Sequence, residues 1–329
     1  MKREKFLDVS KGFSIWCIVF LHYEEGVFPE SFNTFIGSFM VTIFYVCSGW
    51  LLSQKKTILP IRSLLEKRWL QLGKPYIYWT VIILCFDLVL YFVGYYDVYF
   101  LSREVYKAII LRGIGTLWFL PALFGGEVLF HLFIKRSKIH VLGLIGAFIY
   151  LQIYRFIFDG QDDFVWKIIN GPFRTVSNIF VAWFGITIGY CYGKIIWPKF
   201  IKLKSAVQLF LSILLLLIAY CSVNGILFYH IPVISDMMNL FAPLGILSLC
   251  KVLTSWKSFP ICDYWGRHSL NLMVTHYSIT MVLFSLVIEK IMHWQFFGWI
   301  SILCFLCSIP IQYFFVKIVD KKYPFLLGK

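Results

Sequence analysis

The stretch Leu7–Tyr23 has the sequence LDVSKGFSIWCIVFLHY, in which Lys11 and His22 are eleven positions apart and the residues between them are nearly all apolar. Eleven steps along an α-helix make almost three turns and rise about 16 Å, so both side chains fall on one face. If this helix crosses a bilayer, the imidazole lies about half a bilayer deeper than the ammonium. Ionisable groups at that depth are candidates for function. The alternative is a lysine that extends to the surface and a hydrogen-bonded core histidine.

The composition around this stretch is that of an integral membrane protein. Of the 329 residues, 60% are hydrophobic, 20% are aromatic and only 15% are charged, whereas soluble domains carry about 25% charged residues. The net charge of +14 would suit nucleic acid if the cations formed one patch, but they occur in short clusters between apolar runs. We therefore expect the lipid bilayer as a partner and no nucleic acid. The first apolar run lacks a small-residue cleavage site, so we expect it to be retained.

We predict an all-α, polytopic fold with about ten transmembrane helices, because ten apolar runs are long enough to cross a bilayer. These runs lie near residues 10–27, 34–53, 73–94, 117–134, 139–156, 174–193, 204–221, 232–251, 268–288 and 296–317. The fourth run is interrupted by Pro121 and the pair Gly125-Gly126, and the eighth contains Pro243 and begins beside Asp236.

The distribution of lysine and arginine predicts the orientation of these spans. Most of the 31 cations fall at the two termini and in the connections near 55–74, 135–138, 194–204 and 251–267. Positive residues concentrate on the cytoplasmic side, so we predict that both termini are cytoplasmic and that the connection near 156–173, with its three aspartates, lies outside. No internal repeat is evident, so residues 1–329 are treated as one integral membrane domain, multi-pass in the cell membrane, of undetermined oligomeric state.

The basic stretch 54–72, QKKTILPIRSLLEKRWLQL, has leucine and isoleucine interleaved with its cations. This pattern is typical of an amphipathic segment that lies along the cytoplasmic lipid surface. It is equally typical of a plain topogenic anchor. The sequence leaves both interpretations open.

Two deep histidines are the candidates for acid–base chemistry. His22 is followed by Glu24 and Glu25 and has Lys11 below it, and a neutral imidazole accepts a proton near neutral pH. We therefore predict His22 as the general base, with Glu24 in the catalytic set and Glu25 toward the substrate. His276 ends YWGRHSLNLMVTH and is either a second catalytic residue that orients substrate or a core histidine.

Three further segments carry residues that crossing a bilayer does not by itself require. In FYVCSGWLL, Ser48 and Gly49 allow a backbone opening or simply close helix packing. Arg68 and Lys74, at the start of the third run, suit an anionic cofactor, although the excess of cytoplasmic cations alone would place them here. Trp118 is a candidate to stack on a sugar, although tryptophans at the interface usually anchor helices.

Other polar residues are given structural interpretations or none. Glu127 and His131 are four residues apart and share a helix face, either as a proton relay or, more simply, as a structural pair beside Gly125-Gly126. Asp87 is left unassigned. The thiols of Cys304 and Cys307 lie one helical turn apart in an apolar run, which indicates buried thiols and no redox couple.

No metal site is predicted. The sequence has no H-E-x-x-H and no repeated C-x-x-C at zinc-finger spacing. Glycine-rich phosphate loops are absent as well, so coupling to ATP is unsupported.

The motifs quoted above, taken together, resemble those of the integral membrane acyltransferase 3 family. A basic residue, ten intervening residues and a histidine open the family's first helix, as Lys11 and His22 do here. FYVCSGWLL, EKRWLQLGKPYIYW, TLWFLPALF and YWGRHSLNLMVTHY are similar to later family segments and occur in family order over about residues 8–276.

The resemblance implies transfer of an acyl group, usually acetyl, from cytoplasmic acetyl-CoA to a hydroxyl of a cell-surface polysaccharide or lipid-linked saccharide. It implies that Lys11, Arg68, Lys74 and Ser48 hold the acyl-CoA. Two residues depart from the family. Lys11 stands where arginine is common and loses its planar pair of donors, and Gln71 stands where members of the polysaccharide-acetylating branch often carry a second arginine, which puts the cofactor contacts in question.

Two other classes of function remain as alternatives. A proton-coupled transporter or flippase of a glycan precursor would place His22 and Glu127 on a proton path, but the chain shows no two-half hydropathy symmetry. A membrane scaffold without chemistry would leave the alignment of Lys11 with His22 unexplained. The acceptor sugar, its hydroxyl and the length of the acyl group are not predicted.

Overall fold

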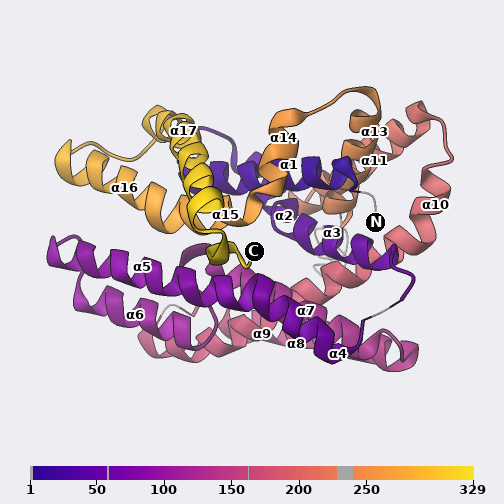
Figure 1. Ribbon diagram of the computed structural model, residues 1–329, viewed down its shortest axis with the longest axis horizontal. Helices are drawn as coiled ribbons and strands as arrows, with labels where there is room; N and C mark the ends of the chain where they lie inside the picture. The colour runs from indigo at the N-terminus through magenta and orange to yellow at the C-terminus, as the bar shows by residue number, and fades with distance from the viewer. Residues whose placement is uncertain (1–2, 58, 162, 228–239) are drawn as a thin grey trace. The chain divides into compact units, whose positions relative to one another are not determined.

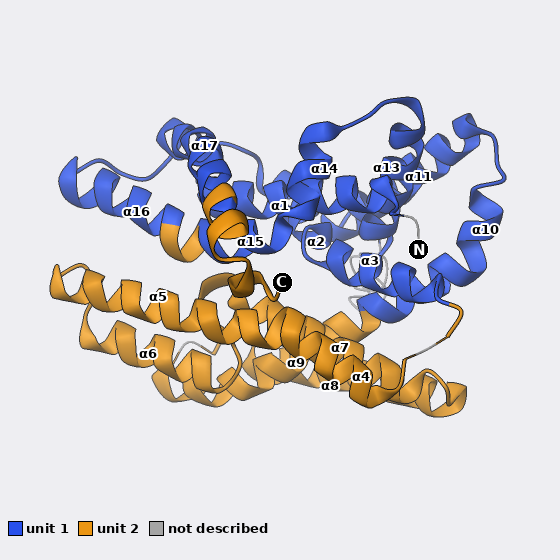
Figure 2. Ribbon diagram, viewed as in Figure 1, with its two compact units in different colours: residues 1–55, 185–276, 280–316 blue, residues 56–184, 277–279, 317–329 orange. Residues whose placement is uncertain are grey.

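The computed structural model describes all residues except 1–2, 58, 162 and 228–239 (Figure 1). The described residues form helices joined by loops and contain no strand, so the predicted all-α fold is confirmed. The chain divides into two compact units (Figure 2). Unit 1 comprises Met1–Lys55, Gly185–His276 and Thr280–Val316, and unit 2 comprises Lys56–Phe184, Tyr277–Ile279 and Lys317–Lys329.

The helices of unit 1 include both candidate histidines. They are α1 (Lys5–Tyr23), α2 (Glu30–Phe39), α3 (Thr42–Ser53), α10 (Trp197–Phe200), α11 (Ser205–Val223), α13 (Phe241–Trp256), α14 (Pro260–Arg267), α15 (Ser269–Thr275), α16 (Val282–Ser285) and most of α17 (Trp299–Lys322). The helices of unit 2 are α4 (Ile61–Arg68), α5 (Lys74–Phe92), α6 (Val98–Ile109), α7 (Phe119–Phe133), α8 (Ser137–Phe158) and most of α9 (Phe164–Cys191).

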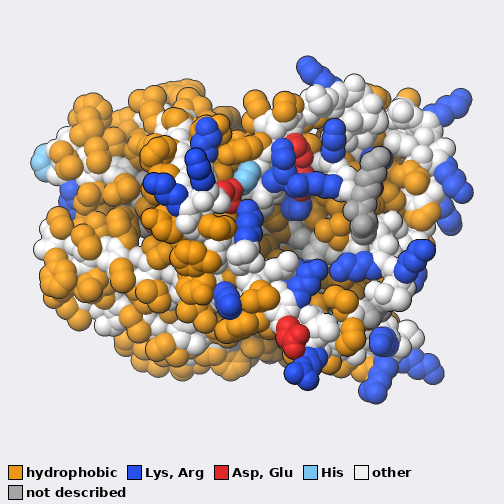
Figure 3. All heavy atoms as spheres, in the orientation of Figure 1, with side chains coloured by type: hydrophobic (Ala, Val, Ile, Leu, Met, Phe, Trp, Pro, Cys, Tyr) orange, Lys and Arg blue, Asp and Glu red, His pale blue; other side chains and the backbone are white. Residues whose placement is uncertain are grey.

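Eight helical segments in the described part of the chain are long and apolar enough to cross a membrane. Hydrophobic side chains also cover much of the visible surface of each unit (Figure 3), and α8 is exposed along almost its whole length. Such surfaces suit lipid as the solvent. The protein is a polytopic membrane protein, as predicted.

The other two of the ten predicted spans correspond to α1 and α13. The helix α1 contains Asp8 as well as Lys11, which makes it less apolar than the other spans. The helix α13 has 16 residues, and the start of its predicted span, 232–239 with Asp236, lies outside the described residues. Asp162 of the predicted outer connection lies outside them as well.

Two glycines bring α1 and α14 into backbone contact within unit 1. A β-carbon at Gly12 would overlap the carbonyl oxygen of Cys262, and one at Gly266 would overlap the carbonyl oxygen of Asp8. Small residues allow such close approach of membrane helices. The contact fixes the position of the basic end of α1 on the rest of the unit.

In unit 2, the basic stretch and the third span form one long helix. The helix α4 continues through a π-helical turn, Trp69–Gly73, directly into α5, and the whole segment Ile61–Phe92 has 32 residues. The second half of the stretch 54–72 is therefore a cytoplasmic extension of the span on the predicted topology, and the structure has no separate surface helix there. The sequence analysis also overlooked α6, which turns back along α5: the Tyr76 hydroxyl donates to the carbonyl of Ala108 at 2.9 Å.

The fourth predicted span is an uninterrupted helix. Pro121 lies in the first turn of α7, where its missing N–H costs no helical hydrogen bond. Gly126 packs against Ala182 and the backbone of Trp183 on α9. The glycine pair is thus a helix contact and does not interrupt α7.

Connections predicted on the same side of the membrane lie together within each unit. In unit 1, the amide of Gly298 donates to the carbonyl of Glu25 at 2.8 Å. In unit 2, the Thr175 hydroxyl donates to the carbonyl of Ile110 at 3.1 Å. These contacts agree with the alternation of spans, and the identity of the cytoplasmic face stays a prediction.

Candidate active site

The two candidate histidines lie side by side in unit 1. His22 is in the last turn of α1, and His276 begins a π-helical turn, His276–Met281, that follows α15. Their ring centroids are 5.2 Å apart and the ring planes meet at 35°. His22 is partly buried, whereas His276 is fully buried. Two imidazoles that the sequence separates by a long distance thus form one pair.

A backbone hydrogen bond determines the tautomer of His276. Its Nδ1 lies 2.8 Å from the carbonyl oxygen of Leu272, and a carbonyl can only accept, so Nδ1 carries the proton. The neutral ring therefore has its lone pair on Nε2. Among the described residues, Nε2 has no hydrogen-bond partner. A buried acceptor without a partner calls for an explanation, and a substrate hydroxyl or a shared proton would provide one.

A buried polar network holds the turn that carries His276. The Thr275 hydroxyl donates to Oε1 of Gln312 at 2.7 Å, and Nε2 of Gln312 donates to the hydroxyl of Thr280 at 2.6 Å. Gln312 comes from α17 and spans the π-helical turn from one end to the other. Such turns within α-helices are frequent at functional sites, and here the network fixes the position of the imidazole.

Glu24 organises the loop that follows α1. Its Oε1 accepts from the amides of Val27 and Phe28 at 2.8 and 2.9 Å, and its Oε2 accepts from the side-chain amide of Asn33. Because three donors hold this carboxylate, the role that the structure shows for Glu24 is structural. Its catalytic role stays a prediction. Glu25 has an exposed side chain, and its amide donates to the hydroxyl of Ser301 at 3.3 Å.

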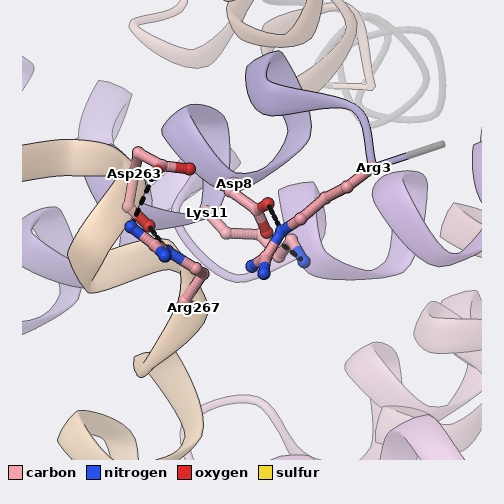
Figure 4. A network of polar contacts seen from close by, with 5 residues as sticks. All are labelled: Arg3, Asp8, Lys11, Asp263 and Arg267. Atoms are coloured by element: carbon pink, nitrogen blue, oxygen red, sulfur yellow. Dashed lines mark hydrogen bonds and ion pairs between the residues drawn. The ribbon is translucent and has the colours of Figure 1, made fainter. Parts of the chain in front are cut away.

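At the other end of α1, Lys11 belongs to a charged cluster (Figure 4). The carboxylate of Asp8 lies 2.6 Å from Nε of Arg3 and 3.4 Å from Nζ of Lys11. On α14, Arg267 pairs with Asp263 at 2.7 Å. The sequence analysis did not single out Asp8, although its spacing of three from Lys11 on one helix was the signal for it.

The Ser-Gly segment of α3 is a packing surface. A β-carbon at Gly49 would overlap the carbonyl oxygen of Ile186, and one at Gly189 would overlap that of Val46. Helix 185–191 therefore packs directly on the backbone of α3. Ser48 is partly buried beside this contact, and its predicted contact with the cofactor is untested.

In unit 2, the arginine predicted to bind the cofactor is already in an ion pair. Two guanidinium nitrogens of Arg68 donate to the two carboxylate oxygens of Glu127, one of them at 2.7 Å, and a third donates to Oε1 of Gln71 at 2.7 Å. Glu127 is buried. Gln71, the residue that departs from the family pattern, thus holds Arg68 in place.

The remaining predicted residues of unit 2 are separately placed. His131 contacts the carbonyl of Leu59 through Nε2, so it holds the stretch before α4 and Glu127 holds α4 itself. This geometry favours the structural interpretation of both residues over a proton relay. Lys74 begins α5 and is partly buried, as is Trp118 at the end of a 3-10 turn, Gly115–Trp118.

The predicted site residues divide between the two units. Lys11, His22, Glu24, Glu25, Ser48 and His276 belong to unit 1, and Arg68, Lys74 and Trp118 belong to unit 2. The described residues contain no group of three or more His, Cys, Asp or Glu that could hold a metal.

Comparison with known families agrees with this arrangement of motifs. The Acyl_transf_3 family model, described as an acyltransferase domain, matches residues 4–313. The chain belongs to the acyltransferase 3 family. It is therefore a membrane acyltransferase. No curated protein and no solved structure matches this chain significantly.

Several polar residues around the histidines of this acyltransferase were not singled out from the sequence. Thr275, Thr280 and Gln312 form the network beside His276, and Asn33 holds Glu24. Each is a polar residue within or next to an apolar run, which is a weak signal, because serine, threonine and asparagine also bond locally within helices. Their roles depend on contacts between distant segments.

Proposed function

We propose that this protein is a membrane O-acyltransferase that moves an acetyl or other acyl group from cytoplasmic acyl-CoA to a hydroxyl of a cell-surface polysaccharide or lipid-linked glycan. The cell membrane is the proposed location. The observation that carries the proposal is the contact of His22 with His276, whose tautomer leaves an acceptor nitrogen buried at the end of α1 opposite to Lys11. Family membership supplies the reaction class.

In the proposed reaction, His22 acts as the general base. The imidazole takes the proton of the acceptor hydroxyl while the hydroxyl oxygen attacks the thioester carbonyl carbon. The tetrahedral intermediate then breaks its carbon–sulfur bond, and the imidazolium returns the proton to the leaving thiolate. The products are the ester and free coenzyme A thiol. Transient acylation of His22 itself would also balance: an imidazole nitrogen displaces the coenzyme A thiolate, the acceptor hydroxyl then takes the acyl group and frees the imidazole, and the hydroxyl proton ends on the thiolate.

His276 is proposed to position His22 or the acceptor hydroxyl. Its Nδ1 proton is held by Leu272, so its Nε2 accepts a hydrogen bond. An N–H of His22 or a substrate O–H could donate that bond. Because Gln312 and its neighbours fix the turn, this acceptor is held rigidly in place, which is how positioned groups lower a barrier.

The basic residues of the two units differ in how readily they could bind the phosphates of acyl-CoA, because other side chains engage them to different extents. Lys11 is partly exposed and lies 3.4 Å from its carboxylate partner, so its ammonium can exchange Asp8 for a phosphate at modest cost. Arg68 donates to Glu127 and Gln71 with three of its nitrogens. The structure therefore supports Lys11 as a phosphate ligand more strongly than Arg68.

The transporter alternative is weakened by the same ion pair. That hypothesis placed Glu127 on a proton path, but its carboxylate accepts two N–H groups from Arg68. Both carboxylate oxygens are engaged by the guanidinium, and such bidentate pairs are strong and geometrically specific. Glu127 is thus better explained as a structural anchor of α4.

The test is a His22→Ala variant in cells. If the variant reaches the membrane at the wild-type level and the surface glycan loses its acyl esters while export continues, the proposal is supported. Intact esters with impaired export would instead indicate transport. A Phe13→Ala variant is a matched control on α1, because Phe13 is exposed and apolar.

A further inference from the structure

Two arginines of unit 2 lie near each other without a counter-ion. Arg112 follows α6 and is partly buried, and Arg174 lies on α9 and is exposed. Burial, and then the positive charge of Arg174, lower the pKa of Arg112. Within the part of the chain that the structure describes, neither guanidinium has a hydrogen-bond or ion-pair partner. Like charges held together in this way repel each other unless an anion joins them.

The backbone around the two arginines is fixed by contacts between helices. The Thr175 hydroxyl donates to the carbonyl of Ile110 at 3.1 Å, which ties the residue after Arg174 to the loop that carries Arg112. A β-carbon at Gly171 would crowd the side chain of Ile110, so the loop packs closely on α9. The two guanidinium groups are therefore brought together by the fold.

The residue before Arg112 has an unfavourable backbone conformation. Leu111 has φ 58°, in the left-handed region, and Gly113 has φ 74°. Glycine adopts such angles freely, but leucine does so only at a cost. Strain of this kind is found where a segment is constrained for function. Here it turns the chain sharply at Arg112.

The carboxylate of Glu104 does not neutralise Arg112. Glu104 is within electrostatic range of it, but its Oε1 is paired with Arg103 at 2.9 Å and with Lys107 at 2.7 Å. Two cations share that single carboxylate. The region around Arg112 therefore has an excess of positive charge, although it belongs to the connections predicted to face outside, which are otherwise poor in cations.

We propose that Arg112 and Arg174 form a binding site for a phosphate group carried by a lipid. Arginine binds phosphate oxygens through two parallel donors. Arg112 lies just before the candidate span Gly115–Phe133, and Arg174 lies within Phe164–Phe200, so the pair is placed near a membrane boundary, where lipid-borne phosphates are found. The phosphate belongs to a phospholipid headgroup, which is a phosphodiester, or to the terminal phosphate monoester of a phosphorylated lipid carrier. This site is independent of the proposed histidine chemistry.

The experiment measures binding by the full-length protein purified in an uncharged sugar detergent, with intrinsic tryptophan fluorescence as the signal. The probes are dodecyl phosphate, a phosphate monoester, and phosphatidylglycerol, a phosphodiester headgroup. We expect Arg174→Gln to raise the Kd for dodecyl phosphate by about tenfold and Arg112→Gln by at least as much. Lys167→Gln is the matched control, because it removes one exposed cation from the same helix.

The outcomes distinguish the two sources of the phosphate and define the result that would overturn the proposal. Binding of both probes that depends on the arginines supports a headgroup site, and binding of the monoester alone supports a carrier-linked phosphate. If Arg112→Gln fails to fold, Arg112→Lys takes its place in the experiment. This variant keeps the charge, so it should retain part of the affinity. The proposal is overturned if Arg174→Gln binds dodecyl phosphate like the wild type, or if Lys167→Gln loses as much affinity.

Discussion

Each unit has a polar site in apolar surroundings, and these two sites differ in whether their buried polar groups have hydrogen-bond partners. In unit 2, Arg68 and Glu127 are both charged, and each satisfies the other through two hydrogen bonds. In unit 1, the paired rings of His22 and His276 leave a buried acceptor nitrogen without a partner among the described residues. A saturated pair is suited to holding helices together, whereas an unsaturated one is suited to exchanging a proton with a substrate.

The largest stability effect should come from breaking the saturated pair. Arg68→Ala removes the ion-pair partner of the buried carboxylate of Glu127, and loss of one partner of a buried ion pair costs about 3–5 kcal/mol. The loss would appear as a lower midpoint of thermal unfolding in detergent. Arg62→Ala is the matched control, because Arg62 pairs with Glu66 on the same helix but both are exposed, so little change is expected. Equal effects for the two variants would contradict the structural role of the Arg68 pair.

The backbone contact that supports the histidine unit gives the next effect. Gly266→Ala adds a β-carbon against the carbonyl of Asp8, and overpacking of this kind costs about 1–3 kcal/mol. Gly146→Ala on α8 is the control, since open space surrounds that position and alanine is a better helix former than glycine. If Gly266→Ala were as stable as Gly146→Ala by thermal unfolding, the close contact of α1 with α14 would be wrong.

The smallest expected effect is on the binding of the acyl-CoA donor and not on stability. Lys11→Arg should keep most activity, because the charge remains. Lys11→Glu should raise the apparent KM for acyl-CoA by about tenfold, the equivalent of one charge-assisted hydrogen bond. Steady-state kinetics with varied acyl-CoA check this. An unchanged KM in Lys11→Glu would show that Lys11 does not contact the phosphates.

How much the sequence could predict depends on the range of the contacts. The helical spacing of Lys11 and His22 and the apolar runs are local patterns, so the all-α membrane fold followed from them. The sequence left the basic stretch 54–72 open between a surface segment and a topogenic anchor, whereas in the structure the π-helical turn Trp69–Gly73 joins its second half to the third span in one helix.

The site was harder to predict because its partners are far apart in the chain. Neither the approach of His276 to His22 nor the pairing of Glu127 with Arg68 has a local signature. Glu127 and His131 share a helix face, as predicted, yet each contacts the segment around α4. Spacing showed which side chains could meet within a helix, and the tertiary fold decided which of them met residues of other helices.

The most direct measurement compares His22→Gln with the wild type, both purified and reconstituted, for acyl transfer from acyl-CoA to a glycan acceptor. Glutamine keeps hydrogen-bonding capacity but cannot accept the proton. We therefore predict that kcat falls by about 100-fold or more, while the unfolding midpoint and the KM for acyl-CoA stay unchanged. A variant that folds normally and retains most of the wild-type kcat would contradict the assignment of His22 as the base.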